Sequence, residues 1–489
     1  MANLRINQDH TQLTEEQRQI ISAVMEGKSL LIQGKPGSGK STVLQALRDT
    51  FHSDPSVYLT SMTGISACVI GMPTSTLHSF MGLVSPLKSG MPADQEHSID
   101  ACTPQGKQRI KKARMLVIDE VSMLSARLFT LLEQLSRVAR RSDAPFGGLQ
   151  IILCGDIYQL PPCPDEPERK FKWFFEADCF ASIVGRSWKE PLNSWNFFEL
   201  KVALRHYIPC DTDGFAKKFS ETAYGIARDV QRSGLQDVIK RLSQPKLWPV
   251  GVVPTTLFAT RELAHQENER QLMKLPGVTY VRYIAEDSGE FVGSGSTLTN
   301  LPETLTLTES APVILLKNHL SCGLCNGSQG VVLSFSSAVD VKSQTIPYLG
   351  KLPSDLGIKL PLVKFCSGQT FYIGFESCGI ESGPDTTDGF RTMMPLLLGF
   401  SMTITRSQGL TLDYVVLDCR KIWHSSLLSV GMTRVRNPDW LEVRNFGNNS
   451  AKLPGKDLLS RFKVDYFPTS EARAKAIDGD SREVKRQRR

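Results

Sequence analysis

The stretch Gly34-Lys35-Pro36-Gly37-Ser38-Gly39-Lys40-Ser41 matches the pattern G-x-x-x-x-G-K-[ST] over its full length. An apolar run, residues 29–33, precedes it, and the helix-patterned residues 42–51 follow. In such a loop, glycines let backbone N–H groups curl around a phosphate, and the N-terminus of the following helix adds positive potential. The stretch therefore predicts a strand, a phosphate-binding loop and a helix, and with them a nucleoside triphosphate site.

The polar residues of this loop have separate roles. The Lys40 amine reaches the oxygens of the β- and γ-phosphates, and the Ser41 hydroxyl is a ligand for Mg²⁺. The residues expected to contact the nucleotide here are Gly34, Gly37, Ser38, Gly39, Lys40, Ser41 and Thr42.

Composition limits the class of protein. The chain has 489 residues, of which 41% are hydrophobic, so it is long enough for about three domains with ordinary cores. Its 57 Lys and Arg exceed its 50 Asp and Glu, which suits a polyanionic partner, although enzymes without a nucleic-acid role reach the same balance.

Targeting signals and disulfides are not expected. The longest apolar stretches, such as residues 395–400, are far shorter than the roughly 20 residues that span a bilayer. Residues 1–19 are polar with an acidic cluster, unlike a secretory or transit peptide, so a nuclear or cytoplasmic location is expected. The eleven cysteines indicate reduced thiols, and the single pair Cys322 and Cys325 lacks a second pair that would complete a zinc site.

Two α/β domains follow from the spacing of apolar runs. Runs at 30–32, 115–118 and 149–153 alternate with helix-length segments, which predicts a parallel sheet covered by helices in a first domain, residues 1–200, with an insertion at about 81–110. The pattern restarts at 255–259 and resumes at 414–417. A second α/β domain is therefore expected over 201–315 and 396–465.

An all-β insertion and a tail complete the organisation. Short strand-like runs separated by Gly, Ser and Pro predict a β insertion at 316–395. Residues 466–489 end in Lys485-Arg486-Gln487-Arg488-Arg489, which predicts a basic, disordered tail. That tail is interpreted as a nuclear-import signal, a phosphate-binding arm or a solvated end.

Polar residues follow the expected strands where ligands of open α/β sheets bind. The run 115–118 ends in Asp119 and Glu120, of which the first suits Mg²⁺ and the second suits activation of an attacking water. Gln159 follows the next strand and can sense the γ-phosphate through a neutral hydrogen bond. The expected chemistry is hydrolysis of the γ-phosphate.

The order and spacing of several motifs resemble those of PIF-type DNA helicases of superfamily one, group B, over roughly residues 13–445. The motifs that carry the resemblance are Leu13-Thr14-Glu15-Glu16-Gln17, the loop 34–41, Thr63-Gly64-Ile65-Ser66-Ala67, Thr76-Leu77-His78-Ser79-Phe80, Val117 to Met123, Gly155-Asp156 with Gln159-Leu160-Pro161-Pro162, Leu324 to Val332, and Met402 to Thr411.

This resemblance implies two RecA-like P-loop domains with small inserted domains, one of them all-β and SH3-like. It implies that Gln17 reads the adenine, that Gly409 contacts the nucleotide, and that Arg205 and Arg434 reach the γ-phosphate from the second domain. A DNA strand would lie across both domains. The residues implied to touch it are Thr63, His78, Phe80, Arg406 and Ser407.

Two of the implied DNA contacts have other readings. Phe80 could stack on a base or pack in the core, since aromatic residues in such positions are usually buried. The same choice applies to His78. The sequence also departs from the common family pattern at His206, Thr405 and Gly431-Met432-Thr433-Arg434, and the last variant is similar to RecD-like and Dda-like relatives.

The resemblance implies an ATP-dependent helicase that moves 5′ to 3′ on single-stranded DNA and unwinds tailed or forked duplexes in replication, repair or recombination. It would use ATP and Mg²⁺, act as a monomeric motor, and have replication or repair proteins as possible partners. The alternative is a DNA-stimulated ATPase that remodels or anneals nucleic acid without processive unwinding. A P-loop kinase or GTPase fits less well, because the chain has no Asn-Lys-x-Asp guanine signature.

Overall fold

A computed structural model provides the structure of the chain. It describes residues 13–63, 66–67, 70, 74–83, 102–162, 171–193, 195–201, 214–228, 235–250, 252–275, 280–289, 301–317, 319, 322, 324, 327–355, 357–383, 386–447, 459, 462–463 and 465–467.

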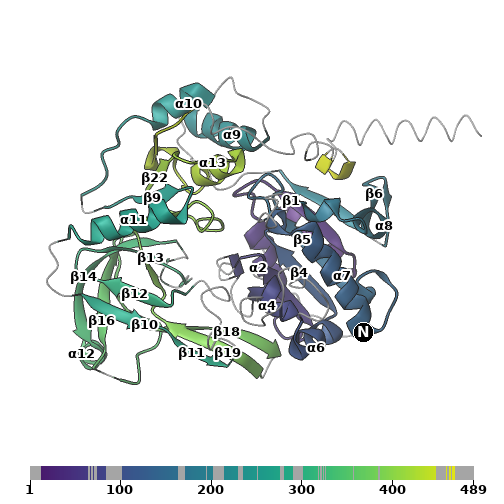
Figure 1. Ribbon diagram of the computed structural model, residues 1–489, viewed down its shortest axis with the longest axis horizontal. Coiled ribbons are helices and arrows are strands. Elements are labelled where there is room, and N and C mark those ends of the chain that lie inside the picture. Colours follow the sequence, from purple (N-terminus) through teal and green to yellow (C-terminus); the bar gives the residue numbers. More distant parts are fainter. Residues whose placement is uncertain are drawn as a thin grey trace, which may run out of the picture.

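The first lobe is built on a parallel sheet of six strands in the order β3-β2-β4-β5-β1-β8 (Figure 1). Its strands are β1 (Leu30–Gly34), β2 (Val57–Ser61), β3 (Thr74–Thr76), β4 (Met115–Asp119), β5 (Gln150–Gly155) and β8 (Asn196–Leu200). Its helices are α1 (Glu15–Met25), α2 (Lys40–Thr50), α4 (Leu77–Met81), α6 (Pro104–Lys112), α7 (Ala126–Arg140) and α8 (Phe180–Val184), with the short 3₁₀ turns η4 (Val121–Met123), η5 (Pro145–Gly148) and η6 (Phe174–Glu176) and the hairpin β6 (Gly185–Ser187) and β7 (Glu190–Pro191).

The central strands of this sheet are buried on both faces. Every residue of β1, β4 and β5 is buried, as expected of a parallel sheet covered by helices. Successive side chains point to opposite faces, so Met115 and Val117 pack in one core with α1 and α2, while Leu116 and Ile118 pack in the other with α7. This packing fixes the strand ends that carry the polar residues of the site.

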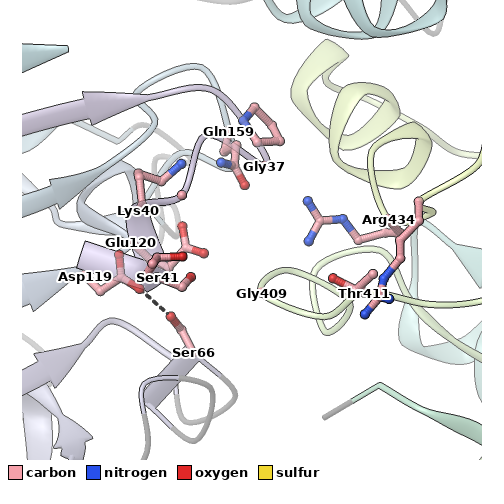
Figure 2. Close-up of a pocket in the computed structure, with 14 residues that line it drawn as sticks. Gly37, Lys40, Ser41, Ser66, Asp119, Glu120, Gln159, Gly409, Thr411 and Arg434 are labelled. Carbon is pink, nitrogen blue, oxygen red and sulfur yellow. Dashed lines mark hydrogen bonds between the residues drawn. The ribbon is translucent and has the colours of Figure 1, made fainter. Parts of the chain in front are cut away.

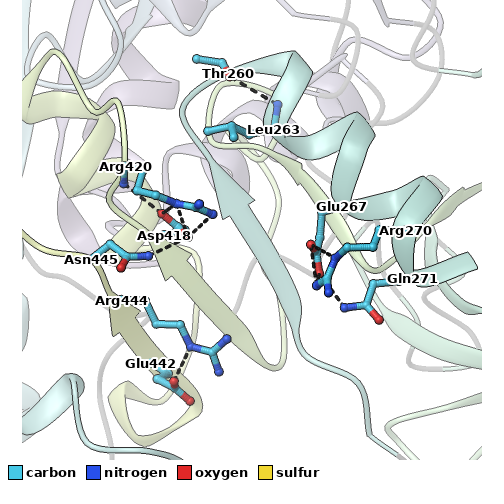
Figure 3. A network of polar contacts seen from close by, with 10 residues as sticks. All are labelled: Thr260, Leu263, Glu267, Arg270, Gln271, Asp418, Arg420, Glu442, Arg444 and Asn445. Carbon is cyan, nitrogen blue, oxygen red and sulfur yellow. Dashed lines mark hydrogen bonds and ion pairs between the residues drawn. The ribbon is translucent and has the colours of Figure 1, made fainter. Parts of the chain in front are cut away.

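The second lobe has a smaller parallel sheet in the order β21-β9-β22-β23. Its elements are α9 (Phe215–Arg228), α10 (Leu235–Leu242), β9 (Thr255–Phe258), α11 (Arg261–Leu272), β21 (Ser401–Thr403), β22 (Val415–Asp418), α13 (Ser425–Met432), η9 (Pro438–Trp440) and β23 (Leu441–Arg444). Asp418, at the end of β22, accepts hydrogen bonds from Arg420 Nε at 3.0 Å and from Asn445 Nδ2 at 3.0 Å (Figure 3). These bonds hold the segments that follow β22 and β23 together.

Sheets that are antiparallel except for the parallel pair β15 and β17 lie between β9 and β21 in the sequence. The strands of this β region are β10 (Val281–Ile284), β11 (Glu286–Gly289), β12 (Thr304–Leu307), β13 (Pro312–Leu315), β14 (Gln329–Ser337), β15 (Tyr348–Leu349), β16 (Lys359–Phe365), β17 (Thr370–Ile373), β18 (Glu376–Gly383), β19 (Thr386–Met393) and β20 (Leu396–Leu398), with α12 (Ala338–Ser343) after β14. The β region thus begins at Val281 and ends at Leu398, a wider span than the expected 316–395.

Two contacts join distant parts of the chain. Strand β18 extends from the β region and contacts β3, α4 and α6 of the first lobe (Figure 1). Near the C-terminus, Phe462, Tyr466 and Phe467 join the aromatic core of the first lobe, and the Tyr466 hydroxyl donates a 2.7 Å hydrogen bond to Gly185 O. The expected disordered tail was therefore placed too early at 466, because these two aromatic residues bury apolar surface; residues 468–489 lie outside the described part.

Residues 84–101, most of the expected insertion at 81–110, also lie outside the described part. In the described residues, no helix combines the length and apolar character that a membrane crossing requires.

Candidate active site

The phosphate-binding loop has the predicted strand–loop–helix form. Gly37 and Gly39 have φ values of 77° and 85°, a region that favours glycine. Gly34 packs so closely that a Cβ there would lie 2.4 Å from Ser38 Oγ. The Lys40 amine donates hydrogen bonds to Gly34 O at 2.7 Å and to Lys35 O at 3.1 Å, so it lies over the loop that is expected to hold phosphate.

Gln17 is hydrogen-bonded to the same loop. Its amide donates a 3.3 Å hydrogen bond to Gly39 O, and its Oε1 accepts from Thr14 N at 2.9 Å as part of a capping box on α1. Gln17 is buried beside the loop. Its position beside Gly39 is compatible with contact to a base, and its role toward adenine stays a prediction.

Asp119 is the last residue of β4 in the first lobe, and Glu120 follows it as the N-cap of η4. Asp119 Oδ2 accepts a 2.6 Å hydrogen bond from Ser66 Oγ (Figure 2). Glu120 has φ of 55°, which is uncommon for a residue other than glycine and marks a constrained turn. A Cβ at Gly155 would lie 2.7 Å from Val121 N, so a glycine on β5 leaves room for this turn.

Burial dominates the electrostatics of the carboxylates. It raises the pKa of Asp119 and that of Glu120, and the negative charge of Asp119 raises the pKa of Glu120 further, while the Lys40 ammonium lowers both. A cation that binds between these groups would be stabilised by their negative charge.

The residues fit Mg²⁺ bound with a nucleotide. Ser41 and Asp119 line the same cavity, and Mg²⁺ usually takes few protein ligands and completes its shell with water and phosphate oxygens. Within the described ranges no group of three or more His, Cys, Asp and Glu forms a protein-only cage. The buried Ser38 Oγ has no hydrogen-bond partner among the described residues, which leaves an orphaned polar atom in the loop.

A buried polar network links β1 to the end of β5. Asp156 Oδ1 accepts from Gln33 Nε2 at 2.9 Å, and its Oδ2 accepts from Gln159 Nε2 at 3.4 Å. Gln33 Oε1 in turn accepts from Ile157 N at 3.2 Å. Gln159 also lines the cavity that contains Lys40, so the network connects the strand before the phosphate loop to the expected γ-phosphate sensor.

The second lobe completes this cavity, which has a volume of about 440 Å³ (Figure 2). Its lining residues from the second lobe are Gly409, Thr411, Arg434 and Arg436. Figure 2 shows Arg434 on the second lobe, across the cavity from Lys40, Asp119 and Glu120. It donates from Nε to Val430 O at 2.8 Å and from Nη1 to Ser407 O at 3.2 Å, so its guanidinium is held by carbonyl groups of its own lobe.

The residues implied to touch DNA fall into two groups. Thr63 and His78 are half-buried and Arg406 is exposed, so they have accessible surface. Phe80 is 1% exposed and packs on Tyr58 with a ring separation of 4.9 Å, which agrees with the core alternative. Ser407 is fully buried, and its hydroxyl donates a hydrogen bond to Ile404 O at 2.7 Å. The short turn after β21 therefore directs this side chain into the protein, away from any surface on which DNA could bind.

Arg205 lies outside the described residues. The sequence interpretation gave no role to Ser66, Asp156 or Gln408, although all three contact predicted site residues. All three residues lie within motifs that carry the family resemblance, and this was the one available signal.

The chain is similar to known proteins of one family. A model of the PIF1-like helicase family matches residues 12–219. The human ATP-dependent DNA helicase PIF1 is 30% identical over 446 residues, which cover 89% of this chain and 61% of the human protein. The chain is similar to PIF1-like helicases over most of its length. The ATP-dependent DNA helicase RRM3 of Saccharomyces cerevisiae is 26% identical over 518 residues, 94% of this chain and 68% of that protein.

Solved structures of PIF1-like helicases confirm the fold class. The crystal structure of Pif1 helicase from Candida albicans matches with a TM-score of 0.68 at 29% identity, covering 92% of this chain and 99% of that one. Unliganded Pif1 from Bacteroides matches with a TM-score of 0.67 and covers 92% and 96%, and its 22% identity establishes the fold alone. Two RecA-like domains are thereby confirmed, and the SH3-like assignment stays a prediction. The chain spans 61% of the length of human PIF1, so the activity of the whole protein is a proposal.

Proposed function

We propose that this chain is an ATP-driven motor that moves 5′ to 3′ along single-stranded DNA and unwinds tailed or forked duplexes. The observation that carries the proposal is the shared cavity, to which the first lobe contributes Lys40, Asp119 and Glu120 and the second contributes Gly409 and Arg434. A nucleotide bound there would contact both lobes, so its hydrolysis would change how they pack. That coupling is what a motor requires.

ATP is the proposed fuel, and Mg²⁺ would be held by the Ser41 hydroxyl and the Asp119 carboxylate. The ion would neutralise charge on the phosphate oxygens when bound. Lys40, now on loop carbonyls, is placed to exchange these partners for the β- and γ-phosphates. Glu120 would accept a hydrogen bond from the attacking water, and Gln159 would contact the γ-phosphate.

Arg434 and Arg205 would supply positive charge from the second lobe. The Arg434 guanidinium has its donors on Val430 and Ser407 carbonyls, so closure of the lobes must turn it toward the phosphate. Hydrolysis would then be slow when the lobes are open and fast when they are closed. In a closed site that excludes water, positive charge stabilises the negative charge of the transition state most strongly. The role of Arg205 rests on the family pattern alone.

DNA would bind across the surfaces near Thr63 and His78 on the first lobe and Arg406 on the second. Their hydroxyl, imidazole and guanidinium groups suit phosphate oxygens. The names of the relatives, ATP-dependent DNA helicases, support this choice of substrate. We place the activity in replication, repair or recombination, with a monomer as the moving unit.

Strand displacement tests the proposal. The purified chain would be mixed with 5′-tailed, 3′-tailed and blunt duplexes of the same sequence, with and without ATP. We expect ATP-dependent displacement from the 5′-tailed substrate alone. Displacement from the 3′-tailed substrate alone would refute the polarity, and binding with stimulated ATP turnover but no displacement would favour the remodelling or annealing alternative.

A further inference from the structure

A hydrogen bond between two buried side chains crosses the ATP cleft. Gln408 Nε2, on the turn after β21, lies 2.9 Å from Glu120 Oε2, on the turn after β4, and the two residues are 288 positions apart. Gln408 is 1% exposed and Glu120 is 7% exposed. Figure 2 shows the neighbouring Gly409 loop reaching across toward Asp119 and Glu120. The expected water-activating group is therefore held by the opposite lobe.

The orientation of the Glu120 carboxylate depends on this bond. The backbone of Glu120 is fixed in a left-handed turn against Gly155. Of the side chains that the structure describes, Gln408 is the one that hydrogen-bonds the carboxylate. A donor to an ionised carboxylate makes a strong hydrogen bond in a site that excludes water. Removing the donor leaves the carboxylate free to rotate.

The choice of glutamine is not explained by stability. The Gln408 Oε1 atom is buried and accepts no hydrogen bond from the described residues. A buried acceptor without a partner carries a desolvation cost. An apolar side chain of similar length, such as methionine, would fill the space without that cost. The amide is therefore best explained by what it does to Glu120.

The turn that carries Gln408 also meets the proposed DNA groove. Arg406 is exposed two residues away, and its backbone N–H donates to Thr403 Oγ1 at 3.1 Å. The same turn accepts the Arg434 guanidinium through Ser407 O at 3.2 Å and Leu410 O at 3.2 Å. A shift of this turn would move the partners of Glu120 and of Arg434 together.

We propose that Gln408 is a positioning residue that orients Glu120 from the second lobe, so that hydrolysis responds to a DNA strand bound beside Arg406. This inference rests on the proposed function. Gln408 touches neither the nucleotide nor the attacking water; it acts through the carboxylate. Binding of single-stranded DNA would adjust the turn 404–410 and bring the carboxylate into the orientation that activates water.

The test compares ATP turnover of three variants with and without single-stranded DNA. Gln408→Met keeps the length and removes the donor, Gln408→His keeps an N–H donor, and Ser401→Ala is the matched control. Ser401 is buried on β21 and its hydroxyl donates to Ala264 O at 2.6 Å, so the control loses a buried hydrogen bond in the same segment but makes no contact with the site. Glu120→Gln gives the background rate of ATP turnover when the expected water-activating group is absent.

We expect Gln408→Met to lower DNA-stimulated kcat on the order of 10- to 100-fold, since lost positioning affects the transition state, while KM for ATP and the affinity for single-stranded DNA stay within about 2-fold. Gln408→His should recover a large part of the loss, and Ser401→Ala should retain stimulated turnover. If Gln408→Met keeps the full stimulation, or if Gln408→His falls as far as Gln408→Met, the inference is overturned. An unstimulated wild type would refute the proposed function as well, and this failure is visible without any variant.

Discussion

Ser66 Oγ donates a 2.6 Å hydrogen bond to Asp119 Oδ2 across 53 residues of sequence. Ser66 follows Thr63 in a segment that is expected to touch DNA, and Ser66 N also donates to Thr63 Oγ1 at 3.2 Å. Ser66 therefore connects Asp119, the carboxylate expected to hold the metal, to the segment that is expected to touch DNA. On each lobe, a segment expected to touch DNA contacts one of the two carboxylates that are expected to be catalytic.

Removing this hydroxyl should weaken the use of Mg²⁺. In Ser66→Ala, Asp119 loses the donor that orients it, and partners of metal ligands typically contribute about 10-fold or more to metal affinity. Turnover measured over a Mg²⁺ titration should need about 10-fold more metal for half-maximal rate. Thr60→Ala is the control, because Thr60 donates to Val117 O at 2.7 Å in the same sheet, away from the cavity. An unchanged titration would assign Ser66 to structure alone.

Lys40→Ala should abolish ATP hydrolysis while DNA binding persists. The amine donates hydrogen bonds to the Gly34 and Lys35 carbonyls inside the phosphate loop. Among the described residues of that loop, Lys40 is the one cationic residue that lines the cavity. Lys35→Ala removes a second amine from the same loop without touching that lining. Turnover and filter binding of single-stranded DNA check the prediction. Near wild-type turnover in Lys40→Ala would refute the assignment of the loop.

Arg434→Ala should lower turnover on the order of 10³-fold with a much smaller change in nucleotide affinity. The reason is that its charge is needed in the closed site rather than in initial binding. Arg420→Ala is the matched control on the same lobe, since Arg420 pairs with Asp418 at 2.8 Å (Figure 3). Single-turnover hydrolysis and nucleotide titration separate the two effects. Equal turnover in Arg434→Ala and the control would assign Arg434 to DNA binding or to structure.

His424 should make the second lobe sensitive to acid. Burial lowers its pKa to about 4 from an ordinary value of 6.5, and its Nδ1 accepts from Ser426 N at 3.1 Å as the N-cap of α13. A lowered pKa in the folded state means that this contribution to stability is complete above pH 6.5 and is lost as pH falls through about 4. The melting temperature of wild type should therefore fall more between pH 7.5 and pH 5 than that of His424→Asn, which keeps a capping oxygen. Parallel pH curves would show that His424 is not responsible.

Local motifs could be read from the sequence because each sits within one strand–turn–helix unit. The phosphate loop, Asp119 with Glu120, and Gln159 all lie where the sequence predicts. The contacts of Ser66 and Gln408 could not be predicted, because they depend on how segments 53 and 288 residues apart meet. The residue pattern within one segment does not show which distant segment it will contact.

The burial of individual side chains could not be predicted from the sequence either. Phe80 and Ser407 lie in motif segments, and only the packing shows that both side chains face inward. The β region is wider than expected because β10, β11 and β12 are short and their pairing partners are distant in sequence, so alternation of side chains gives a weak signal. Tyr466 and Phe467 are buried against the first lobe although a charged run follows them.

We propose that ATP hydrolysis in the shared cavity is coupled to a bound DNA strand. The most direct measurement is ATP turnover of the wild-type chain with and without single-stranded DNA at one fixed salt concentration. A coupled motor must hydrolyse ATP faster on DNA, because a bound DNA strand would act on the turn whose groups hydrogen-bond Glu120 and Arg434. Stimulation of turnover is the predicted result. Equal turnover in the two conditions, with DNA shown to be bound, would contradict the account.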